Sequence, residues 1–404
     1  MRSSIDHVTA RDLLMARVSP VGTEQVALSL SAGRVLARDL IAAENIPPFD
    51  RSPYDGYAFR AADTEGASRE HPVELTVLEE VAAGAVPTRP VTPGTACKIL
   101  TGAPIPEGAD AVRMYERTEF TQSTVRLFAP ARPGENIVRA GEDVRAGTVL
   151  ARSGCVIDAG VAGTLCAQGE ALATVYRRAR IGLISTGNEV VEADAPLAPG
   201  KIRNANRSML EAALRREGME PVYLGIAGDD AQRIARLIGQ ALADCDAVLL
   251  TGGVSVGDYD LTPEAMDLAG CETLVRGVDL KPGMACAYGV KDGKLVCGLS
   301  GNPASALTNL YVIVMPALRR LAGRADALPR EITVTLQDGF DKPSRGTRVL
   351  RGRLDLSDGT VRMVLPGDQG NVVLSSAIGC DAMAIVPAGS GKLEPQTVLK
   401  GFVL

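Results

Sequence analysis

The hydrophobic positions between residues 179 and 324 alternate between two patterns. Short apolar runs typical of buried strands lie at 180–186, 221–227, 246–250 and 294–299. Segments of helical composition lie between or after them, at 206–218, 231–245 and after 299 through Arg320. This alternation predicts a doubly wound α/β domain, with helices on both faces of a parallel sheet and ligands at the carboxyl ends of its strands.

Two other parts of the chain have the pattern of β-structure. Beyond Ala325, period-two alternation predicts strands at 332–336, 347–354 and 360–365, and Asp358-Gly359 is a hairpin turn signal. Residues 47–140 are rich in Pro, Gly and β-branched residues. We therefore expect a small C-terminal β domain and a second β-rich module, the latter inserted between helical segments at 1–45 and 155–178.

Composition and charge narrow the classes of protein. The chain has 404 residues, 46% hydrophobic and 23% charged, which is typical of a globular protein of several domains. A net charge of -5 without any run of Lys or Arg argues against nucleic acid as a partner. Charged residues Asp6, Arg11 and Asp12 interrupt the N-terminal segment, and no stretch of about 18 apolar residues occurs. We expect a cytoplasmic protein without a membrane span.

Cysteine and histidine offer little chemistry. The eight cysteines are scattered without a CxxC pair, so the sequence does not support a structural zinc site or a redox dithiol. We expect reduced, mostly buried thiols. Only His7 and His71 could supply an imidazole. Carboxylates and phosphate chemistry are therefore the better candidates.

The segment TGGVSVGDYD at 251–260 follows the buried run that ends at Leu250. Glycine-rich loops after a strand commonly hold phosphates, but Asp258 and Asp260 stand where a Walker loop has Lys and Ser or Thr. Carboxylates beside such a loop are useful when Mg²⁺ lies between protein and phosphate. We therefore expect Gly252 and Gly253 to let backbone N–H groups approach an anion, and Asp260, with Asp258 and Glu189, to hold the metal.

Four more polar segments fall at predicted strand ends or helix starts. Glu189 lies just past the end of one strand, Asn204 and Asn206 enter a helix, and Asp229 or Asp230 caps the next one. The segment LSGNP places Pro303 near the first turn of a further helix. One such loop alone is usually structural, because turns favour Gly, Asn and Asp. Five loops on one rim indicate a ligand site.

Outside the α/β domain, three loops contain further candidates. Asp55 lies in the turn segment SPYDGYA at 52–58, although Asp-Gly alone is usually only a turn. Thr101 begins a Pro/Gly-rich loop and offers a hydroxyl group to a ligand. Glu142 and Asp143 lie at an expected domain junction.

Taken together, these motifs resemble the molybdopterin molybdenumtransferase family, which includes the E domain of gephyrin. The resemblance runs from about Gly33 to the C-terminus, through PFDRSPYDGYA, TGAPIPEGADAV, GED, STGNE, GGVSVGDYD, KPGM and GNP in that order. It implies a homodimer whose subunits contain a helical linking domain, a β-rich domain, an α/β molybdopterin-binding domain and a C-terminal β-barrel. We assign these to residues 1–46 with 141–178, 47–140, 179–324 and 325–404.

The resemblance also implies an activity. Members of the family insert molybdenum from molybdate into adenylylated molybdopterin, with Mg²⁺-dependent release of AMP. The active site lies where the α/β domain of one subunit faces the β-rich domain of the other, and a molybdopterin adenylyltransferase is the expected substrate donor.

Family positions carried over to this chain give three sets of candidate residues. The candidates for catalysis are Asp55, Thr101, Asp143, Glu189 and Asp260. The candidates for substrate binding are Ser185, Thr186, Gly187, Asn206, Asp229, Gly252, Gly253, Ser255, Lys281, Gly301, Asn302 and Pro303. The candidates for metal binding are Asp260, Glu189 and Asp258. In this interpretation Asp55 and Thr101 reach across the dimer, and Gly252 and Gly253 approach the pterin phosphate.

The chain departs from the family pattern at several site positions. The departures are Asn188 and Asn204 in place of Asp, Pro263 and Met284 in place of Lys, and Ser300 in place of Pro; Lys281 is retained. Loss of two cations beside an anionic ligand weakens its binding, since a charge-assisted hydrogen bond contributes about 1.5 to 3 kcal/mol. Two alternatives therefore stay open: a non-catalytic pterin-binding or scaffolding paralogue, and an enzyme that inserts tungsten from tungstate.

Overall fold

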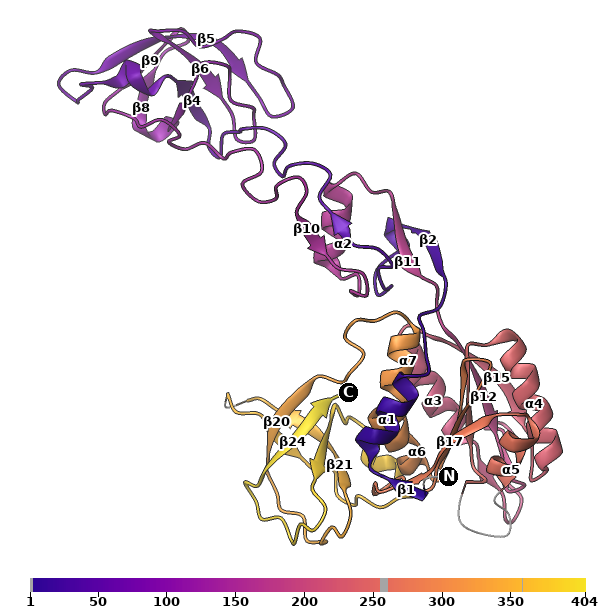
Figure 1. Ribbon diagram of the computed structural model, residues 1–404. Helices are drawn as coiled ribbons and strands as arrows, with labels where there is room; N and C mark the ends of the chain where they lie inside the picture. The colour runs from indigo at the N-terminus through magenta and orange to yellow at the C-terminus, as the bar shows by residue number, and fades with distance from the viewer. Residues whose placement is uncertain (1–2, 255–260, 358) are drawn as a thin grey trace. The chain divides into compact units, whose positions relative to one another are not determined.

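The computed structural model describes residues 3–254, 261–357 and 359–404 (Figure 1). Its contacts divide the chain into two compact units. Unit 1 consists of Met1–Arg38, Ser153–Ala162 and Leu172–Leu404, and unit 2 of Asp39–Arg152 and Gly163–Ala171. The finer boundaries of the four expected domains stay a prediction.

Unit 1 contains a seven-stranded sheet in the order β1-β17-β18-β19-β16-β12-β15. In chain order its strands are β1 (Ser3–Ile5), β12 (Arg180–Ser185), β15 (Glu220–Ile226), β16 (Ala247–Thr251), β17 (Glu272–Val278), β18 (Ala287–Lys291) and β19 (Lys294–Leu299). The four strands from β19 to β15 pair in parallel, as the alternating pattern predicts. The expectation of a wholly parallel sheet is wrong at β18, which is antiparallel to β17 and β19.

The reason for this difference is a tight hairpin between β18 and β19. Asp292 and Gly293 connect the two strands with φ values of 52° and 75°, and Lys291 pairs directly with Lys294. Two successive residues with positive φ are the geometry of the turn that joins antiparallel strands, and Asp-Gly is a favoured pair for it. This dipeptide is therefore the sequence signal for the antiparallel strand.

Helices cover both faces of the sheet, as expected (Figure 1). The helices are α1 (His7–Met15), α3 (Ala205–Arg216), α6 (Pro303–Asn309) and α7 (Met315–Leu321) on one face, and α4 (Ala231–Asp244) and α5 (Leu261–Leu268) on the other. Strand β16 shows why both faces are apolar. Its Leu249 packs into the core under α3 and α6, whereas its Leu250 packs under α4 and α5.

The predicted long helix through Arg320 is interrupted. A π-helical turn, Leu310–Val314, separates α6 from α7. Pro316 has no backbone N–H and cannot donate to the carbonyl four residues earlier, so a regular α-helical ladder cannot pass through it. The π-helical turn is still part of the apolar core, since Leu310, Ile313 and Val314 are all buried.

The C-terminal part of unit 1 is a closed five-stranded barrel, which confirms the expected β-barrel. Its strands are β20 (Glu331–Leu336), β21 (Arg348–Asp355), β22 (Arg362–Val364), β23 (Ala382–Val386) and β24 (Val398–Val403). Val334, Leu350 and Leu399 contribute to its apolar core. The predicted turn at Asp358-Gly359 includes Asp358, which lies outside the described residues.

The expectation of helical segments at 1–45 and 155–178 is right only for α1 and α2 (Ala159–Ala167). Much of the remaining structure is β: β2 (Thr23–Ala27) pairs antiparallel with β11 (Leu172–Tyr176) in unit 1. Burial alternates along β11, as in a strand with one covered face: Ala173 and Val175 are buried, whereas Leu172 is exposed. These stretches are too short for the sequence pattern to distinguish them from helical turns.

Unit 2 is dominated by a six-stranded sheet in the order β7-β4-β6-β5-β9-β8. Its strands are β4 (Gly56–Phe59), β5 (Val73–Val81), β6 (Thr95–Ile99), β7 (Ala111–Met114), β8 (Thr118–Phe120) and β9 (Thr124–Leu127). Both faces of β4 are buried, with Tyr57 and Phe59 in one core and Ala58 in another. A short pair, β3 (Leu40–Ile41) with β10 (Val149–Ala151), also belongs to unit 2. The β-rich expectation for 47–140 is confirmed.

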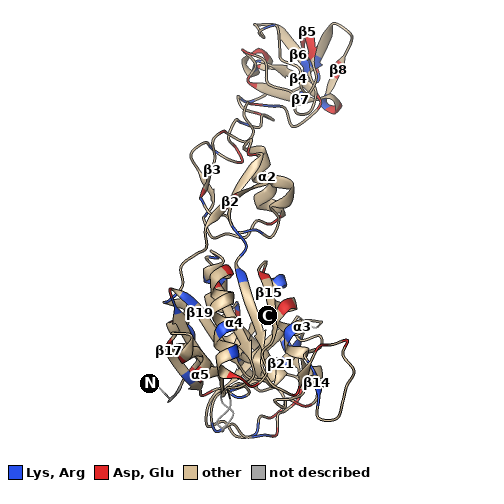
Figure 2. Cartoon of the chain, turned by 90° about the vertical axis from the view of Figure 1, so that its right-hand side faces the viewer, with Lys and Arg blue, Asp and Glu red and all other residues tan. Residues whose placement is uncertain are grey.

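Charged residues lie mainly on the outer surfaces of the elements (Figure 2). On α4, Ile234, Ile238 and Ala241 are buried against the sheet, and the blue and red segments of this helix in Figure 2 mark its charged residues. Within the described ranges, none of the helices combines the length and apolarity that crossing a bilayer requires.

Candidate functional site

The candidate site lies at the carboxyl ends of three neighbouring parallel strands in unit 1. Strand β12 ends at Ser185, β16 at Thr251 and β19 at Leu299, and these strands are paired side by side. The loops that follow them contain most of the predicted site residues. The shared rim expected from the sequence therefore exists.

Two cavities open along this rim. The first, of about 370 Å³, is lined by Glu189, Gly252, Gly253, Val254, Gly283, Met284, Ala285, Ser300, Gly301, Asn302, Ser305 and Asn371. The second, of about 410 Å³, is lined by Ser185, Thr186, Glu189, Val190, Ile202, Arg203, Asn204, Ala205, Asn206, Thr251, Gly301, Asn302, Pro303 and Val372. Glu189, Gly301 and Asn302 line both, so the two cavities are adjacent parts of one crevice.

Close backbone packing explains the two glycines after β16. Gly252 has φ 97°, and a Cβ there would lie 2.5 Å from Thr186 Oγ1. Gly253 has φ 62°, and a Cβ there would lie 2.9 Å from Thr262 Oγ1. Thr262 Oγ1 in turn donates to the Gly252 carbonyl at 2.8 Å. Only glycine fits at these positions, and it leaves the backbone exposed to the first cavity.

Glu189 lies in the loop after β12, at the mouth shared by the two cavities. Its carboxylate is exposed and forms no hydrogen bond with another described residue. Gly187, with φ 117°, makes room for it, because a Cβ at Gly187 would lie 2.6 Å from Glu189 Oε2. The carboxylate is therefore available to a ligand or a cation.

Asn204 lines the second cavity and is held in a hydrogen-bond network. Its Oδ1 caps α3 by accepting from Arg207 N at 3.2 Å, and its Nδ2 donates to Ser185 Oγ at 2.9 Å and to Tyr223 Oη at 3.1 Å. Tyr223 donates onward to Glu192 at 2.7 Å, and burial followed by this carboxylate raises the pKa of Tyr223 to about 12. Asn suits this position better than the family's Asp, because an aspartate has no N–H to donate.

The loop after β12 is joined to the loop before α4. Asn188 N donates to Asp229 Oδ2 at 3.1 Å, and Asp229 N donates to Asn188 Oδ1 at 3.2 Å. Asp230, rather than Asp229, caps α4 by accepting from Arg233 N at 3.0 Å. Asp229 contributes to neither cavity lining, so its contacts assign it to holding the Glu189 loop.

Among the residues that the structure describes, no Lys or Arg lines the first cavity. Met284 lines it and is 61% exposed, at the position where the family pattern has Lys. The retained Lys281 is exposed and lines neither cavity; its backbone pairs with the barrel, where it accepts from Val349 N at 2.8 Å. Any anion bound here must therefore be balanced by backbone N–H groups or by a cation that arrives with the ligand.

The expected metal site is only partly within the described residues. Asp258, Asp260 and Ser255 lie outside them, and Glu189 is the one predicted metal ligand that the structure describes. Among described residues, no group of three His, Cys, Asp or Glu side chains is arranged to hold a metal ion. A free carboxylate at a cavity without cations fits Mg²⁺, which binds one or two carboxylates together with phosphate oxygens and water.

Asp55, Thr101 and Asp143 belong to unit 2 and are thus in a different compact unit from Glu189. Asp55 Oδ1 accepts hydrogen bonds from Thr101 N at 2.7 Å and Thr101 Oγ1 at 2.8 Å. These bonds, the backbone one first, hold the pKa of Asp55 below its usual value. Asp143 is exposed, and its N–H donates to Ile46 O at 3.0 Å. The structure therefore pairs Asp55 with Thr101 and leaves Asp143 apart.

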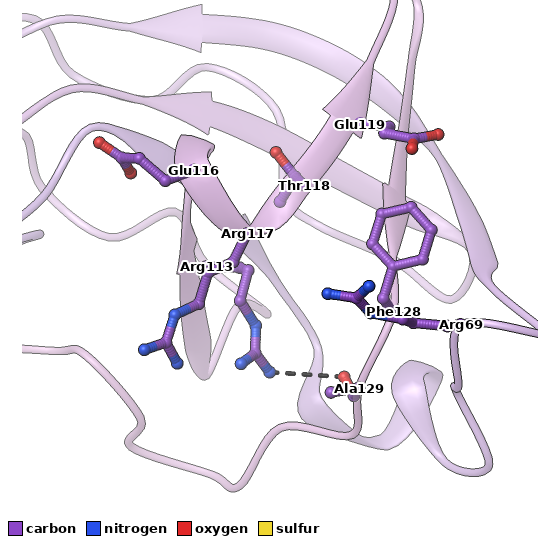
Figure 3. A pocket seen from close by; sticks show the side chains of 8 residues that line it. All are labelled: Arg69, Arg113, Glu116, Arg117, Thr118, Glu119, Phe128 and Ala129. Carbon is purple, nitrogen blue, oxygen red and sulfur yellow. Dashed lines mark hydrogen bonds between the residues drawn. The ribbon is translucent and has the colours of Figure 1, made fainter.

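A further cavity, of about 630 Å³, lies in unit 2 and was not expected from the sequence (Figure 3). Arg69, Arg113 and Arg117 line it together with Glu116, Glu119 and Phe128. Arg113 is ion-paired with Glu135 at 3.0 Å and donates to the Ala129 carbonyl. None of the predicted site residues is among the residues that line this cavity.

Two barrel residues, Asn371 and Val372, line the crevice and were missed by the sequence analysis. A fully buried arginine supports the chain on both sides of these two residues: Arg351 Nε donates to Ser376 Oγ at 3.0 Å and Arg351 Nη2 to Gly370 O at 3.3 Å. Gln369 completes the arrangement by bonding both the N–H and the carbonyl of Arg351. The sequence did not predict that Asn371 and Val372 line the crevice, because they are far in sequence from the α/β domain.

Comparisons with known proteins agree with this architecture. Family models match at residues 5–169, described as "MoeA N-terminal region (domain I and II)", and at 182–320, described as "Probable molybdopterin binding domain". A molybdopterin molybdenumtransferase of Staphylococcus epidermidis strain RP62A is 33% identical over 96% of this chain and 93% of its own length. One of Staphylococcus aureus strain Mu50 is 35% identical over 90% of this chain and 87% of its own. The crystal structure of the molybdopterin biosynthesis moeA protein of Pyrococcus horikoshii OT3 superposes with a TM-score of 0.85 at 31% identity, covering 99% of this chain and 100% of that one.

Proposed function

This chain belongs to the molybdopterin molybdenumtransferase family, and we propose that it performs the transfer in the crevice at the ends of β12, β16 and β19. It is a transferase of molybdenum cofactor biosynthesis. The observation that carries the proposal is the pair of adjacent cavities sharing Glu189, Gly301 and Asn302. One crevice with two compartments suits a substrate that has two dissimilar ends, a pterin and a nucleotide.

The proposed reaction is hydrolysis of the phosphoanhydride of adenylylated molybdopterin, with release of AMP and insertion of molybdenum from molybdate at the dithiolene. The chain's own contribution is mainly positioning. Gly252 and Gly253 expose backbone to the first cavity, where N–H groups can bind phosphate oxygens. Asn204 holds Ser185, and the Asn188–Asp229 pair holds the Glu189 loop. Ser185, Thr186, Asn302 and Pro303 complete the walls around the substrate.

Magnesium is the proposed cofactor. Glu189 supplies one carboxylate, and Asp260 and Asp258 stay the proposed partners on sequence grounds. When bound, Mg²⁺ would offset the charge of the phosphates and polarise the phosphorus that is attacked. Such a cation would supply the positive charge that the described lining of the first cavity lacks.

The functional protein is proposed to be a homodimer. The family resemblance assigns Asp55, Thr101 and Asp143 to the same active site as Glu189, although unit 2 is a separate compact body. In the proposal, the β-rich domain of one subunit contributes these residues to the α/β domain of the other. Lys281, outside both cavity linings, is proposed to act through long-range attraction of the anionic substrate.

A molybdopterin adenylyltransferase is the proposed donor of substrate, and the cytoplasm the proposed compartment. All eight cysteines are unpaired, and five of them are buried, which suits a reducing compartment. Neither nucleic acid nor a membrane is part of the proposal.

The decisive experiment measures AMP release from adenylylated molybdopterin by the purified chain with Mg²⁺. Parallel reactions contain molybdate, tungstate or no oxyanion. Stimulation of AMP release by molybdate supports the proposed transferase, and stimulation by tungstate alone identifies the oxyanion as tungstate. Tight substrate binding without AMP release under any condition would instead identify a non-catalytic paralogue, the alternative that the missing cations of the first cavity favour.

A further inference from the structure

The 630 Å³ cavity of unit 2 is lined from both edge strands of the β-rich sheet (Figure 3). The order of this sheet begins with β7 and ends with β8, although the two strands are consecutive in the chain. Arg113 of β7 and Glu119 of β8 both line the cavity. Its lining shares no residue with either compartment of the crevice, so it is a separate place for a ligand.

Two arginines of this cavity have free guanidinium groups. The side chains of Arg69 and Arg117 are exposed and form no hydrogen bond or ion pair with another described residue. Arg113, in contrast, is buried: its Nη1 is ion-paired with Glu135 at 3.0 Å, and its Nη2 donates to the Pro130 carbonyl at 3.1 Å. The cavity therefore offers two cations with unused donors, beside a third that is built into its wall.

Phe128 gives the cavity an aromatic surface. It follows β9, in which Val125 and Leu127 are buried in the core, so the alternation of the strand directs the Phe128 side chain to the opposite face. The ring is partly buried and belongs to neither of the two apolar cores of unit 2. Thr118 pairs with Leu127, and Arg117 and Phe128 directly flank this pair. An unused guanidinium group and an aromatic ring thus line one cavity from adjacent strands.

Two carboxylates in the lining limit the negative charge that the cavity accepts. Glu116 and Glu119 are exposed, and in Figure 3 their carboxylates point away from the guanidinium groups of Arg113 and Arg117. A phosphate monoester carries a charge of about −1.5 to −2 at neutral pH. Two free guanidinium groups match this charge. Additional phosphate groups would bring further negative charge toward the two glutamates.

We propose that this cavity binds a nucleoside monophosphate, with its phosphate on Arg69 and Arg117 and its base against Phe128. A guanidinium group can bind two phosphate oxygens at once. An aromatic side chain offers a base a surface on which to stack. The volume lies within the range of small-ligand sites, about 300 to 1,000 Å³. This inference goes beyond the proposed function and does not depend on it, since none of these residues lines the crevice.

A tryptophan reporter tests this cavity separately from the crevice. The chain has no Trp, so Phe128→Trp places its only indole at the cavity. AMP is expected to quench the indole fluorescence saturably, because its base stacks on the indole. Adenosine has the same base without the phosphate, and is expected to bind at least about 10-fold more weakly. ATP is expected to bind no more tightly than AMP.

Arg69→Gln and Arg117→Gln, each made in the Phe128→Trp protein, test the phosphate contacts. Each is expected to raise the Kd of AMP about 10-fold, because it removes charge-assisted hydrogen bonds. Arg126→Gln is the matched control. Arg126 is also exposed and lies on the β8–β9 hairpin, but it is ion-paired with Glu74 at 2.7 Å and does not line the cavity. This variant removes the same charge and is expected to change the Kd little.

Ala129→Trp is a second reporter, because Ala129 is exposed, lines the same cavity and leaves Phe128 in place. Thermal unfolding shows which variants fold as wild type does. Calorimetric titration of wild type and of Arg69→Gln with AMP makes the same comparison without a reporter, and is expected to show binding that Arg69→Gln weakens.

The absence of saturable quenching by AMP with a folded reporter would overturn the inference. Equal Kd values for AMP and adenosine, or an unchanged Kd in both arginine variants, would do the same. Tighter binding of ATP than of AMP would show that the ligand is not a monophosphate. Tighter binding of a hexaglutamate peptide than of AMP would assign the cavity to an acidic segment of a partner protein instead.

Discussion

Thr101 donates two hydrogen bonds to a single oxygen of Asp55, one from its backbone N–H at 2.7 Å and one from its hydroxyl at 2.8 Å. The two residues are 46 positions apart, at the ends of the adjacent strands β4 and β6. The pair fixes an exposed carboxylate in its ionised form at the edge of the β-rich sheet. Its geometry gives unit 2 a defined anionic group to present to a ligand.

Thr101→Val is expected to raise the pKa of Asp55. The backbone N–H bond, which lowers this pKa most, remains, and the hydroxyl bond is lost. Because the folded-state pKa is depressed, ionised Asp55 stabilises the fold fully above about pH 4 and loses this effect as pH falls through the folded pKa. In the variant, whose folded pKa is closer to the unfolded one, this loss is smaller and is complete at a higher pH. A ¹³C titration of labelled aspartate carboxyls measures the change.

Asp50 is the internal reference for that titration. Its pKa is also depressed, by the Ala140 N–H and by Arg139, and it has no contact with Thr101. Its titration is expected to be the same in both proteins. A variant in which Asp55 titrates as in wild type would show that the hydroxyl bond is absent in solution.

Mixing two inactive variants tests the shared active site. Asp55→Ala and Glu189→Ala are each expected to abolish AMP release. If each site combines Asp55 of one subunit with Glu189 of the other, a refolded mixture contains heterodimers with one intact site, and about a quarter of wild-type activity returns. Glu189→Ala mixed with Asp260→Ala is the control. Both changes lie in the α/β domain, so no intact site can form and no activity returns.

Recovery in the control mixture, or none in the test mixture, would contradict the shared site. Sedimentation of each mixture confirms that heterodimers have formed, so that failure to assemble is not mistaken for an unshared site.

The sequence predicted the α/β rim well because local rules specify it. Buried runs such as 246–250 and helix caps such as Asn204 and Asp230 depend on neighbours within a few residues. The same rules missed the antiparallel strand β18, although its signal, Asp292-Gly293, is local. The π-helical turn before Pro316 was missed because it depends on hydrogen-bond register rather than on the apolar pattern.

Long-range contacts within unit 1 set the limit of the prediction. Asn371 and Val372 reach the crevice from the barrel, and only a folded barrel that contains the buried Arg351 places them there. The hydrogen bond from Asn206 to the Gly301 carbonyl was equally hidden, because the two residues are 95 positions apart in the sequence. Sequence motifs identified the loops of the site. The hydrogen-bond partners of each loop residue depend on tertiary packing, which the motifs do not specify.

Gly252→Ala is expected to destabilise the fold and to remove activity. An alanine at this position would have to keep the positive φ of Gly252, which costs about 1–2 kcal/mol. Its Cβ would also lie 2.9 Å from the carbonyl oxygen of Thr186. Gly293→Ala is the matched control, since Gly293 has φ 75° with nothing near its Cβ position. Urea unfolding should show a loss of about 1–2 kcal/mol for Gly293→Ala and a larger loss for Gly252→Ala. Equal losses with retained AMP release would refute the close packing of the glycine loop.

Met284→Lys is expected to strengthen binding of anions in the first cavity. No Lys or Arg in the described part of the chain lines this cavity, and Met284, which does line it, is 61% exposed. Because solvent screens an ammonium at this exposure, we expect about a 10-fold decrease in the Kd of pyrophosphate at low salt, at the lower end of what a charge-assisted hydrogen bond provides. The gain should shrink as ionic strength rises.

Leu356→Lys is the matched control. Leu356 is also 61% exposed but lines neither compartment of the crevice, so this variant adds the same charge elsewhere and should change the Kd little. An equal gain from both substitutions would mean that net charge alone acts, and that the first cavity is not where the phosphates bind.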